Sequence, residues 1–255
     1  MQRRDYIVQG RESIPGWFDR GDAELFNAID QAQQSAGVVG DLLEIGCFQG
    51  ASAILLGYLR RENERLVICD LFQESPSSLD EFHRRRDVYA GLSRSSFEAN
   101  YLRFHAELPE IFAQSSTTLS SAGLERTFRF IHVDGSHDYE DVRADLLLAK
   151  SLLVPGGFVV FDDIITLHAP GVTAAVWEGV VRDELTPLYQ TSKLYATWGD
   201  PLKVDIPKEF NQFTHEVSGH TMAHLEYLET RRSLMSKVRR RLQRALRERR
   251  LRVHA

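Results

Sequence analysis

The chain has 255 residues, 43% of them hydrophobic and 26% charged, which suffices for one α/β domain with a full core. This composition is that of an ordinary soluble globular protein, and no apolar run approaches the length of a membrane-spanning helix. The first ten residues lack the apolar segment of a secretory signal. Cys47 and Cys69 lie in apolar, strand-like surroundings, so we expect buried thiols and a cytoplasmic protein.

The net charge of −5 conceals an uneven distribution along the chain. Residues 231–255 contain eleven of the 31 Lys and Arg residues but one of the 36 acidic residues, Glu248. The first 230 residues therefore hold twenty basic groups against 35 acidic ones. This acidic body argues against nucleic-acid binding. The basic tail suits a partner chain, an anionic membrane surface or the acidic body of a second copy, or it is simply a peripheral helix.

Apolar periodicity predicts alternating helices and strands up to about residue 200. The expected helices cover 22–35 (with Asp22 as cap), 51–56, 95–106, 139–153 and 171–182. The expected strands cover 41–45, 65–70, 110–113, 128–133, 158–161, 185–190 and 194–198. Five strands separated by helices and two close together indicate an α/β fold with one antiparallel edge. We expect one domain over 1–205 and a basic, mainly helical extension over 206–255.

Two predicted strands within residues 128–164 each end in acidic side chains, Asp134 on the first and Asp162-Asp163 on the second. A helix joins the strands, so we expect them to be parallel and adjacent, with their carboxyl ends about 5 Å apart. Carboxylates crowded there repel unless a proton or cation lies among them, and oxygen ligands suit Mg²⁺. The alternative is that these aspartates only cap helices and turns. Joint ligation by Asp162 and Asp163 requires the strand to end or bend there, because strand neighbours face opposite ways.

A glycine turn follows the first expected strand and leads into a helix. Gly46 and Gly50 allow a ligand to approach the backbone, and the helix start offers unpaired N–H groups. A dinucleotide loop has three glycines, but Phe48 takes the middle place and Glu44 adds a negative charge. This pattern disfavours NAD and favours a ligand with an ammonium group. Asp70, at the end of the next strand, suits ribose hydroxyls, or else caps a turn.

These motifs resemble those of class I S-adenosylmethionine-dependent methyltransferases, in particular the metal-dependent O-methyltransferases that act on sugars of macrolide and aminocoumarin antibiotics. The resemblance covers about residues 14–200 and rests on LLEIGCFQGAS, the CD at the second strand end, IHVDGSHDYEDVRADL and PGGFVVFDDI. It implies a Rossmann-like methyltransferase fold, which is a doubly wound, mostly parallel sheet of seven strands whose last strand inserts antiparallel.

The resemblance also implies roles for individual residues. The implied cofactor-binding residues are Glu44, Gly46 and Gly50 for the methionine end, Asp70 for the ribose, and Ser115 and Ser116 near the adenine. The implied ligands of a divalent cation, usually Mg²⁺, are Asp134, Asp162 and Asp163. Asp134 and His137 are the implied catalytic residues, with His137 as the general base. His168 remains a second candidate for the base, and His132 is expected in the core.

We therefore expect an S-adenosylmethionine- and divalent-metal-dependent O-methyltransferase that acts on a hydroxyl of a small molecule, most simply a sugar of a secondary metabolite or glycolipid. A sugar hydroxyl is a poor nucleophile at neutral pH, so a metal ion that lowers its pKa and a base that takes its proton both fit this chemistry. We expect a homo-oligomer, by base rate a dimer, formed through helices or the C-terminal extension. The alternatives are an NAD-dependent oxidoreductase on the same fold and a non-catalytic binding protein that uses the basic tail.

Overall fold

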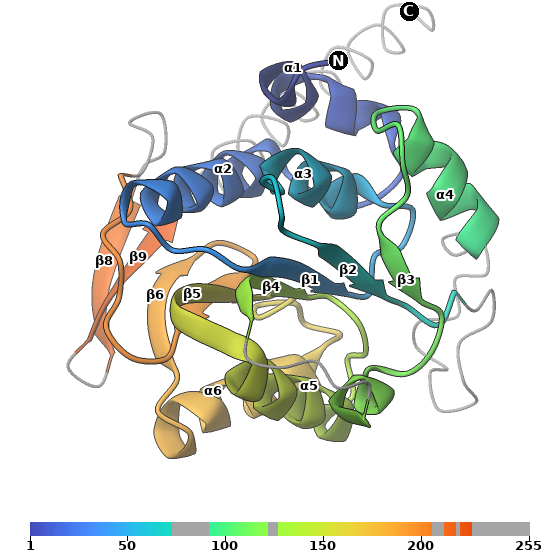
Figure 1. Ribbon diagram of the computed structural model, residues 1–255. Coiled ribbons are helices and arrows are strands. Elements are labelled where there is room, and N and C mark those ends of the chain that lie inside the picture. The colour runs from blue at the N-terminus through green and yellow to red at the C-terminus, as the bar shows by residue number, and fades with distance from the viewer. Residues whose placement is uncertain (73–91, 122–126, 206–211, 218–219, 226–255) are drawn as a thin grey trace, which may run out of the picture.

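The structure is a computed structural model that describes residues 1–72, 92–121, 127–205, 212–217 and 220–225 (Figure 1). Its α-helices are α1 Arg3–Val8, α2 Arg20–Ser35, α3 Ala51–Leu59, α4 Arg94–Leu102, α5 Tyr139–Leu152 and α6 Pro170–Arg182, with 3-10 turns at Gly10–Ser13 and Ser116–Ser121. Its strands are β1 Asp41–Ile45, β2 Leu66–Cys69, β3 Glu110–Phe112, β4 Phe128–Val133, β5 Leu153–Phe161, β6 Thr186–Gln190, β7 Leu194–Thr197, β8 Gln212–Val217 and β9 His220–Leu225.

The strands form one sheet in the order β3-β2-β1-β4-β5-β7-β6-β9-β8. The strands from β1 to β5 run parallel, and β7 lies antiparallel between β5 and β6. This confirms the predicted doubly wound, mostly parallel arrangement of seven strands with one antiparallel insertion. From β1 the chain adds β2 and β3 on one side, and β4 and β5 are then added on the other side of β1. Ligands of such folds bind at the carboxyl ends of the strands on either side of this change in strand order, here β1 and β4.

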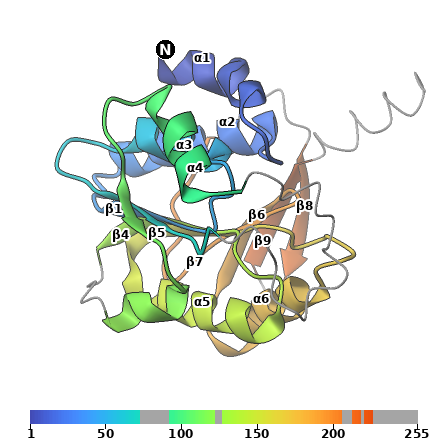
Figure 2. The same cartoon turned by 90° about the vertical axis from the view of Figure 1, so that its right-hand side faces the viewer.

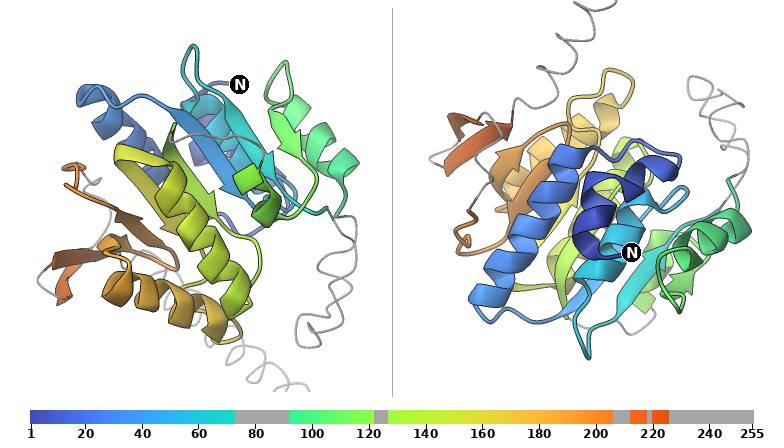
Figure 3. Two further views of the ribbon diagram at one scale, coloured as in Figure 1. Left: turned by 60° about the horizontal axis from the view of Figure 1, so that its bottom comes forward. Right: turned by 90° about the horizontal axis from the view of Figure 1, so that it is seen from above.

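Helices cover both faces of the sheet (Figures 1 and 2). Alternate strand residues supply the two cores, because successive side chains on a strand point to opposite faces. Phe130 and Val160 pack on the side of α2 and α3, whereas Ile131 and Val159 pack on the side of α5 and α6. Figure 3 shows α1 lying over α2 and α3 when the molecule is seen from above. No helix in the described part of the chain is long and apolar enough to cross a bilayer.

The described residues of the C-terminal extension form strands, whereas the sequence predicted mainly helix. Residues 212–217 and 220–225 form the antiparallel hairpin β8–β9, and β9 pairs in parallel with β6. The mainly helical prediction is therefore wrong for these residues, because pairing with the exposed edge of β6 outweighs local propensity. The rest of the extension, including the basic segment 231–255, lies outside the described residues.

Asp22 does not cap α2 as predicted. The helix begins at Arg20, its N-cap is Asp19, and the Asp22 side chain is buried. The Asp22 carboxylate accepts hydrogen bonds from the Tyr195 hydroxyl at 2.6 Å and the Thr191 hydroxyl at 2.7 Å. Asp22 therefore ties α2 to the β6–β7 hairpin.

Candidate active site

Asp134 and Asp162 lie at the ends of the neighbouring strands β4 and β5, as predicted. The ladder pairs Val133 with Phe161, and the Asp162 amide donates a hydrogen bond to the Val133 carbonyl at 3.0 Å. The Asp134 amide donates to the Ile45 carbonyl at 2.7 Å, which brings the end of β1 to the same place. The acidic side chains therefore lie where the sheet order reverses, the usual ligand site of such sheets.

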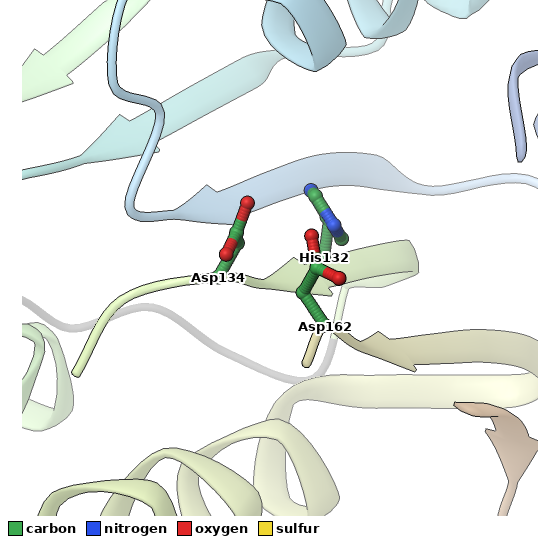
Figure 4. A group of neighbouring side chains, drawn as sticks. All are labelled: His132, Asp134 and Asp162. Atoms are coloured by element: carbon green, nitrogen blue, oxygen red, sulfur yellow. The ribbon is translucent and has the colours of Figure 1, made fainter. Parts of the chain in front are cut away.

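The acidic side chains at this edge form two groups that share Asp134. In one group, ligand atoms of His132, Asp134 and Asp162 lie within 4.8 Å of one another (Figure 4). In the other group, ligand atoms of Asp134, His137 and Asp163 do so. Neither of these groups, found among the residues that the structure describes, contains both Asp162 and Asp163. The three aspartates predicted as one ligand set are thus divided between two groups.

Asp163 turns away from the line of β5. Its backbone is left-handed, with φ of 57°, which is uncommon for a residue with a side chain. Its carboxylate accepts a hydrogen bond from the Thr166 hydroxyl at 2.5 Å and lies 3.0 Å from Nε2 of His137. Burial alone raises the pKa of Asp163, but the His137 and Thr166 hydrogen bonds outweigh it and lower the pKa to about 2. An ionised carboxylate therefore faces His137.

Lys193 is a site residue that the sequence did not reveal. It lies in the β6–β7 turn, its ammonium group donates a hydrogen bond to Oδ2 of Asp162, and its side chain is 2% exposed. Burial alone lowers the pKa of Lys193, but the carboxylates of Asp162, Asp134 and Asp22 raise it above its ordinary value. A lysine in a hairpin turn is usually solvated, so no local pattern marks this one as buried.

Asp134 lies in surroundings that disfavour its negative charge. Burial and the neighbouring Asp162 raise the pKa of Asp134 well above its ordinary value, while Lys193 acts in the opposite direction. A carboxyl group in this position takes up a proton or a cation. The raised pKa therefore marks a place that accommodates further positive charge, as functional carboxylates often do.

Glu44 and His132 face each other from β1 and β4, and both side chains are fully buried. Nδ1 of His132 lies 2.7 Å from Oε1 of Glu44. Among the described residues, neither Oε2 of Glu44 nor Nε2 of His132 has a hydrogen-bond partner. Buried polar atoms are nearly always paired, so unpaired ones indicate the place of a ligand. His132 is buried as predicted, but its ring also faces Asp134 and Asp162 (Figure 4).

The glycine turn packs closely against the chain's own backbone at the end of β4. Gly46 has φ of 79°, and a Cβ atom at this position would lie 2.1 Å from the Asp134 carbonyl oxygen. Asp70 braces the turn, since its carboxylate accepts hydrogen bonds from the Cys47 and Phe72 amides, both at 2.7 Å. Asp70 thus has the turn-capping role left open above, and each oxygen keeps a lone pair for a ligand.

Ser115 and Ser116 follow β3, and neither is a member of the two acidic groups. The Ser115 hydroxyl lies 2.9 Å from that of Thr117. Ser116 is hydrogen-bonded to Asp145 of α5, and both residues line a pocket with Leu148. No role was predicted for Asp145, because an acidic residue within a helical pattern resembles any solvated acid.

Asp145 provides a test of this buried contact through the pH dependence of stability. Burial raises the pKa of Asp145 to about 6, although Ser116 lowers it. The folded pKa exceeds the unfolded value, so the stabilising contribution of Asp145 is present below about pH 4 and is lost as the pH rises through 6. We expect Asp145→Asn to gain stability over the unaltered chain by about 1 kcal/mol between pH 5 and pH 8. Urea unfolding at both values measures this gain. Glu140→Gln, an exposed change on the same helix, should show none, and an equal gain there would contradict the assignment.

Both candidate bases lie at the acidic edge. His137 contacts Asp163, and its side chain is 21% exposed. The ring centroids of His137 and His168 are 6.1 Å apart. The structure thus brings both histidines together beside the carboxylates of β4 and β5.

Residues 43–164 match a family model described as a methyltransferase domain. The matched segment runs from β1 to just beyond β5 and includes the glycine turn and both acidic strand ends. This segment is similar to methyltransferase domains. The match confirms the predicted enzyme class and gives no support to the oxidoreductase alternative.

Solved structures of methyltransferases share the fold. The O-methyltransferase NovP superposes with a TM-score of 0.57 at 22% identity, over 70% of this chain and 81% of that chain. CalS11, a calicheamicin methyltransferase, gives 0.51 at 18% identity over 69% and 80%. The SAH-bound methyltransferase PaMTH1 of Podospora anserina gives 0.50 at 17% identity over 77% and 88%. No curated protein matches this chain in sequence.

Proposed function

We propose that the methyltransferase domain transfers the methyl group of S-adenosylmethionine to a hydroxyl oxygen of a small molecule. The observation that carries this proposal is the buried Glu44, whose Oε2 has no partner among the described residues, beside the Gly46 turn. A buried carboxylate requires a positive partner, and the methionine ammonium group supplies one. The SAH bound to PaMTH1 supports the same donor on this fold.

We assign the other contacts with S-adenosylmethionine to the residues that the sequence predicted for them. The helix α3 begins at Ala51, directly after the turn from Gly46 to Gly50. The first N–H groups of a helix have no partner within the helix, and they suit the carboxylate of S-adenosylmethionine. Asp70 has lone pairs for the ribose hydroxyls. We assign Ser115 or Ser116, which follow β3, to the neighbourhood of the adenine.

We further propose that a divalent cation such as Mg²⁺ binds at the acidic edge around Asp134. The predicted ligands Asp134, Asp162 and Asp163 all lie there, and their oxygens suit this ion. The raised pKa of Asp134 and the unpaired Nε2 of His132 also fit added positive charge. When bound, the cation lowers the pKa of an acceptor hydroxyl.

In the proposed reaction, the acceptor oxygen forms a bond to the methyl carbon as the carbon–sulfur bond breaks. The sulfonium becomes a neutral thioether, and the hydroxyl proton leaves. We assign that proton to His137, which its contact with Asp163 holds at the acidic edge. His168 remains the second candidate, and replacing each histidine by glutamine would distinguish them.

The resemblance to sugar O-methyltransferases supports a proposal for the acceptor class. NovP is an O-methyltransferase and CalS11 a calicheamicin methyltransferase, which favours a secondary metabolite. We propose a sugar hydroxyl of such a metabolite or of a glycolipid. Cytoplasmic residence and a homo-oligomer remain predictions.

Calorimetry with S-adenosylmethionine tests the donor. We expect binding by the full chain, and about 30-fold weaker binding by Glu44→Gln, because a charge-assisted hydrogen bond worth about 2 kcal/mol is lost. Glu140→Gln, an exposed change on α5, is the control and should bind as the unaltered chain does. Absence of binding at millimolar donor would contradict the proposal.

A further inference from the structure

We propose that Lys193 is a built-in cation that neutralises Asp162, so that Asp162 caps the turn at Asp163 and is not a metal ligand. The divalent cation then binds to Asp134, His137 and Asp163, and Asp162 is a positioning residue. A metal-bound imidazole cannot take the acceptor proton, so in this arrangement the role of base passes from His137 to His168, the second candidate, whose ring lies 6.1 Å away. This inference rests on the divalent cation of the proposed function, and it changes the ligand set that the resemblance implies.

Hydrogen bonds within the β6–β7 turn fix the backbone from which the Lys193 side chain extends. The Lys193 amide donates a hydrogen bond to the Thr191 hydroxyl at 3.0 Å, and its carbonyl accepts one from the Thr191 amide at 2.8 Å. The Thr191 hydroxyl in turn donates to Asp22 at 2.7 Å. Since the Lys193 side chain is 2% exposed, water cannot replace Asp162 as the partner of its ammonium group.

Both carboxylate oxygens of Asp162 are engaged. Oδ2 accepts from the Lys193 ammonium group, and Oδ1 accepts from the Asp163 amide at 2.7 Å. The second contact caps the left-handed turn at Asp163, whose φ is 57°. A divalent ion on Asp162 would also lie next to the buried ammonium group and be repelled by it. Asp162 therefore fixes the corner and is a poor metal ligand.

The corner directs Asp163 toward the second acidic group. Thr166 orients one carboxylate oxygen of Asp163, and the other faces His137. The hydrogen bond that Thr166 donates is of the kind by which a neighbouring residue orients a metal ligand. The side chains of His137 and Asp163 are 21% and 28% exposed, so an ion can reach them from solvent. With Asp134 they supply two carboxylates and one imidazole within 4.8 Å.

The competing arrangement places the ion between His132, Asp134 and Asp162. In its favour, Nε2 of His132 is buried and unpaired, and Glu44 holds the other ring nitrogen, as in many metal-bound histidines. Against it, Lys193 already occupies Asp162. The two arrangements make opposite predictions for Asp162 and Asp163.

The test is Mn²⁺ binding to the full chain, measured by electron paramagnetic resonance, with thermal unfolding of each variant. We expect Asp163→Asn to weaken Mn²⁺ binding by about 30-fold or more. The double variant Asp162→Asn with Lys193→Met removes both charges of the pair, and the new amide can still accept from the Asp163 amide. We expect its Mn²⁺ affinity to stay within about threefold of the unaltered chain.

The inference is overturned if the double variant loses Mn²⁺ affinity and Asp163→Asn keeps it. If the double variant remains folded and loses Mn²⁺ as Asp163→Asn is expected to, Asp162 is a ligand and the His132 group holds the ion. His132→Phe, which leaves Asp163 and His137 in place, should then also lose Mn²⁺, whereas our inference expects it to be retained. If the unaltered chain binds S-adenosylmethionine but no Mn²⁺ at millimolar concentration, the cation of the proposed function fails, and this inference fails with it.

Discussion

Replacing Asp134 with asparagine is expected to lower kcat/KM for methyl transfer about 1,000-fold, which corresponds to about 4 kcal/mol of barrier. Asp134 belongs to both acidic groups, so either position of the cation depends on its charge. Asparagine keeps the shape of the side chain and removes a charge that its surroundings disfavour, so we expect the fold to be kept. The measurement is the rate of S-adenosylhomocysteine formation with Mg²⁺ and an acceptor found by screening glycosides.

The matched control for this variant is Asp138→Asn, four residues along the chain. Asp138 is exposed and occupies the N-cap of α5 without a side-chain cap hydrogen bond. We expect its rate to stay within about threefold of the unaltered chain. Full activity of a folded Asp134→Asn variant would refute the assignment of the acidic edge as the reaction site.

Replacing Arg129 with methionine is expected to reduce the free energy of unfolding by about 3–5 kcal/mol. Arg129 is on β4 and fully buried, and its guanidinium group makes two 2.8 Å hydrogen bonds to Glu64. It also donates to Gln33 at 2.8 Å and lies 3.2 Å from Asp30. Without the guanidinium group, Glu64 loses both short contacts with a cation and is left with Arg61 at 3.9 Å, whereas Asp30 still pairs with Arg3 and Arg61 at 2.9 Å. Urea unfolding at pH 7 measures the loss.

Two further variants separate buried charge from simple packing. Adding Glu64→Gln to Arg129→Met should recover part of the lost stability, because the uncompensated charge is removed. Arg65→Met is the control, since the Arg65 side chain is 49% exposed and pairs with Asp41 near the surface. We expect it to cost about 1 kcal/mol or less. Equal losses from Arg65→Met and Arg129→Met would contradict the role of the buried network.

The sequence predicted most of the architecture because its signals are local. Apolar residues at intervals of two and of three to four define strands and helices whatever their neighbours, and glycine and proline mark the turns. The prediction was wrong for residues 212–217 and 220–225, where pairing with β6 decides the structure. It was also wrong for Asp22, because a side chain at a helix start can serve either as cap or as a tertiary contact.

By itself, the sequence determined that acidic side chains end two neighbouring parallel strands and that a glycine turn follows the first strand. The tertiary structure alone decided which charges meet. Glu44 and His132 are 88 residues apart, and Lys193 and Asp162 are 31 apart. These contacts depend on strand order and register, which a local pattern does not encode. For that reason the sequence could place Asp162 and Asp163 in one ligand set, whereas the folded chain gives Asp162 to a buried lysine and turns Asp163 toward His137.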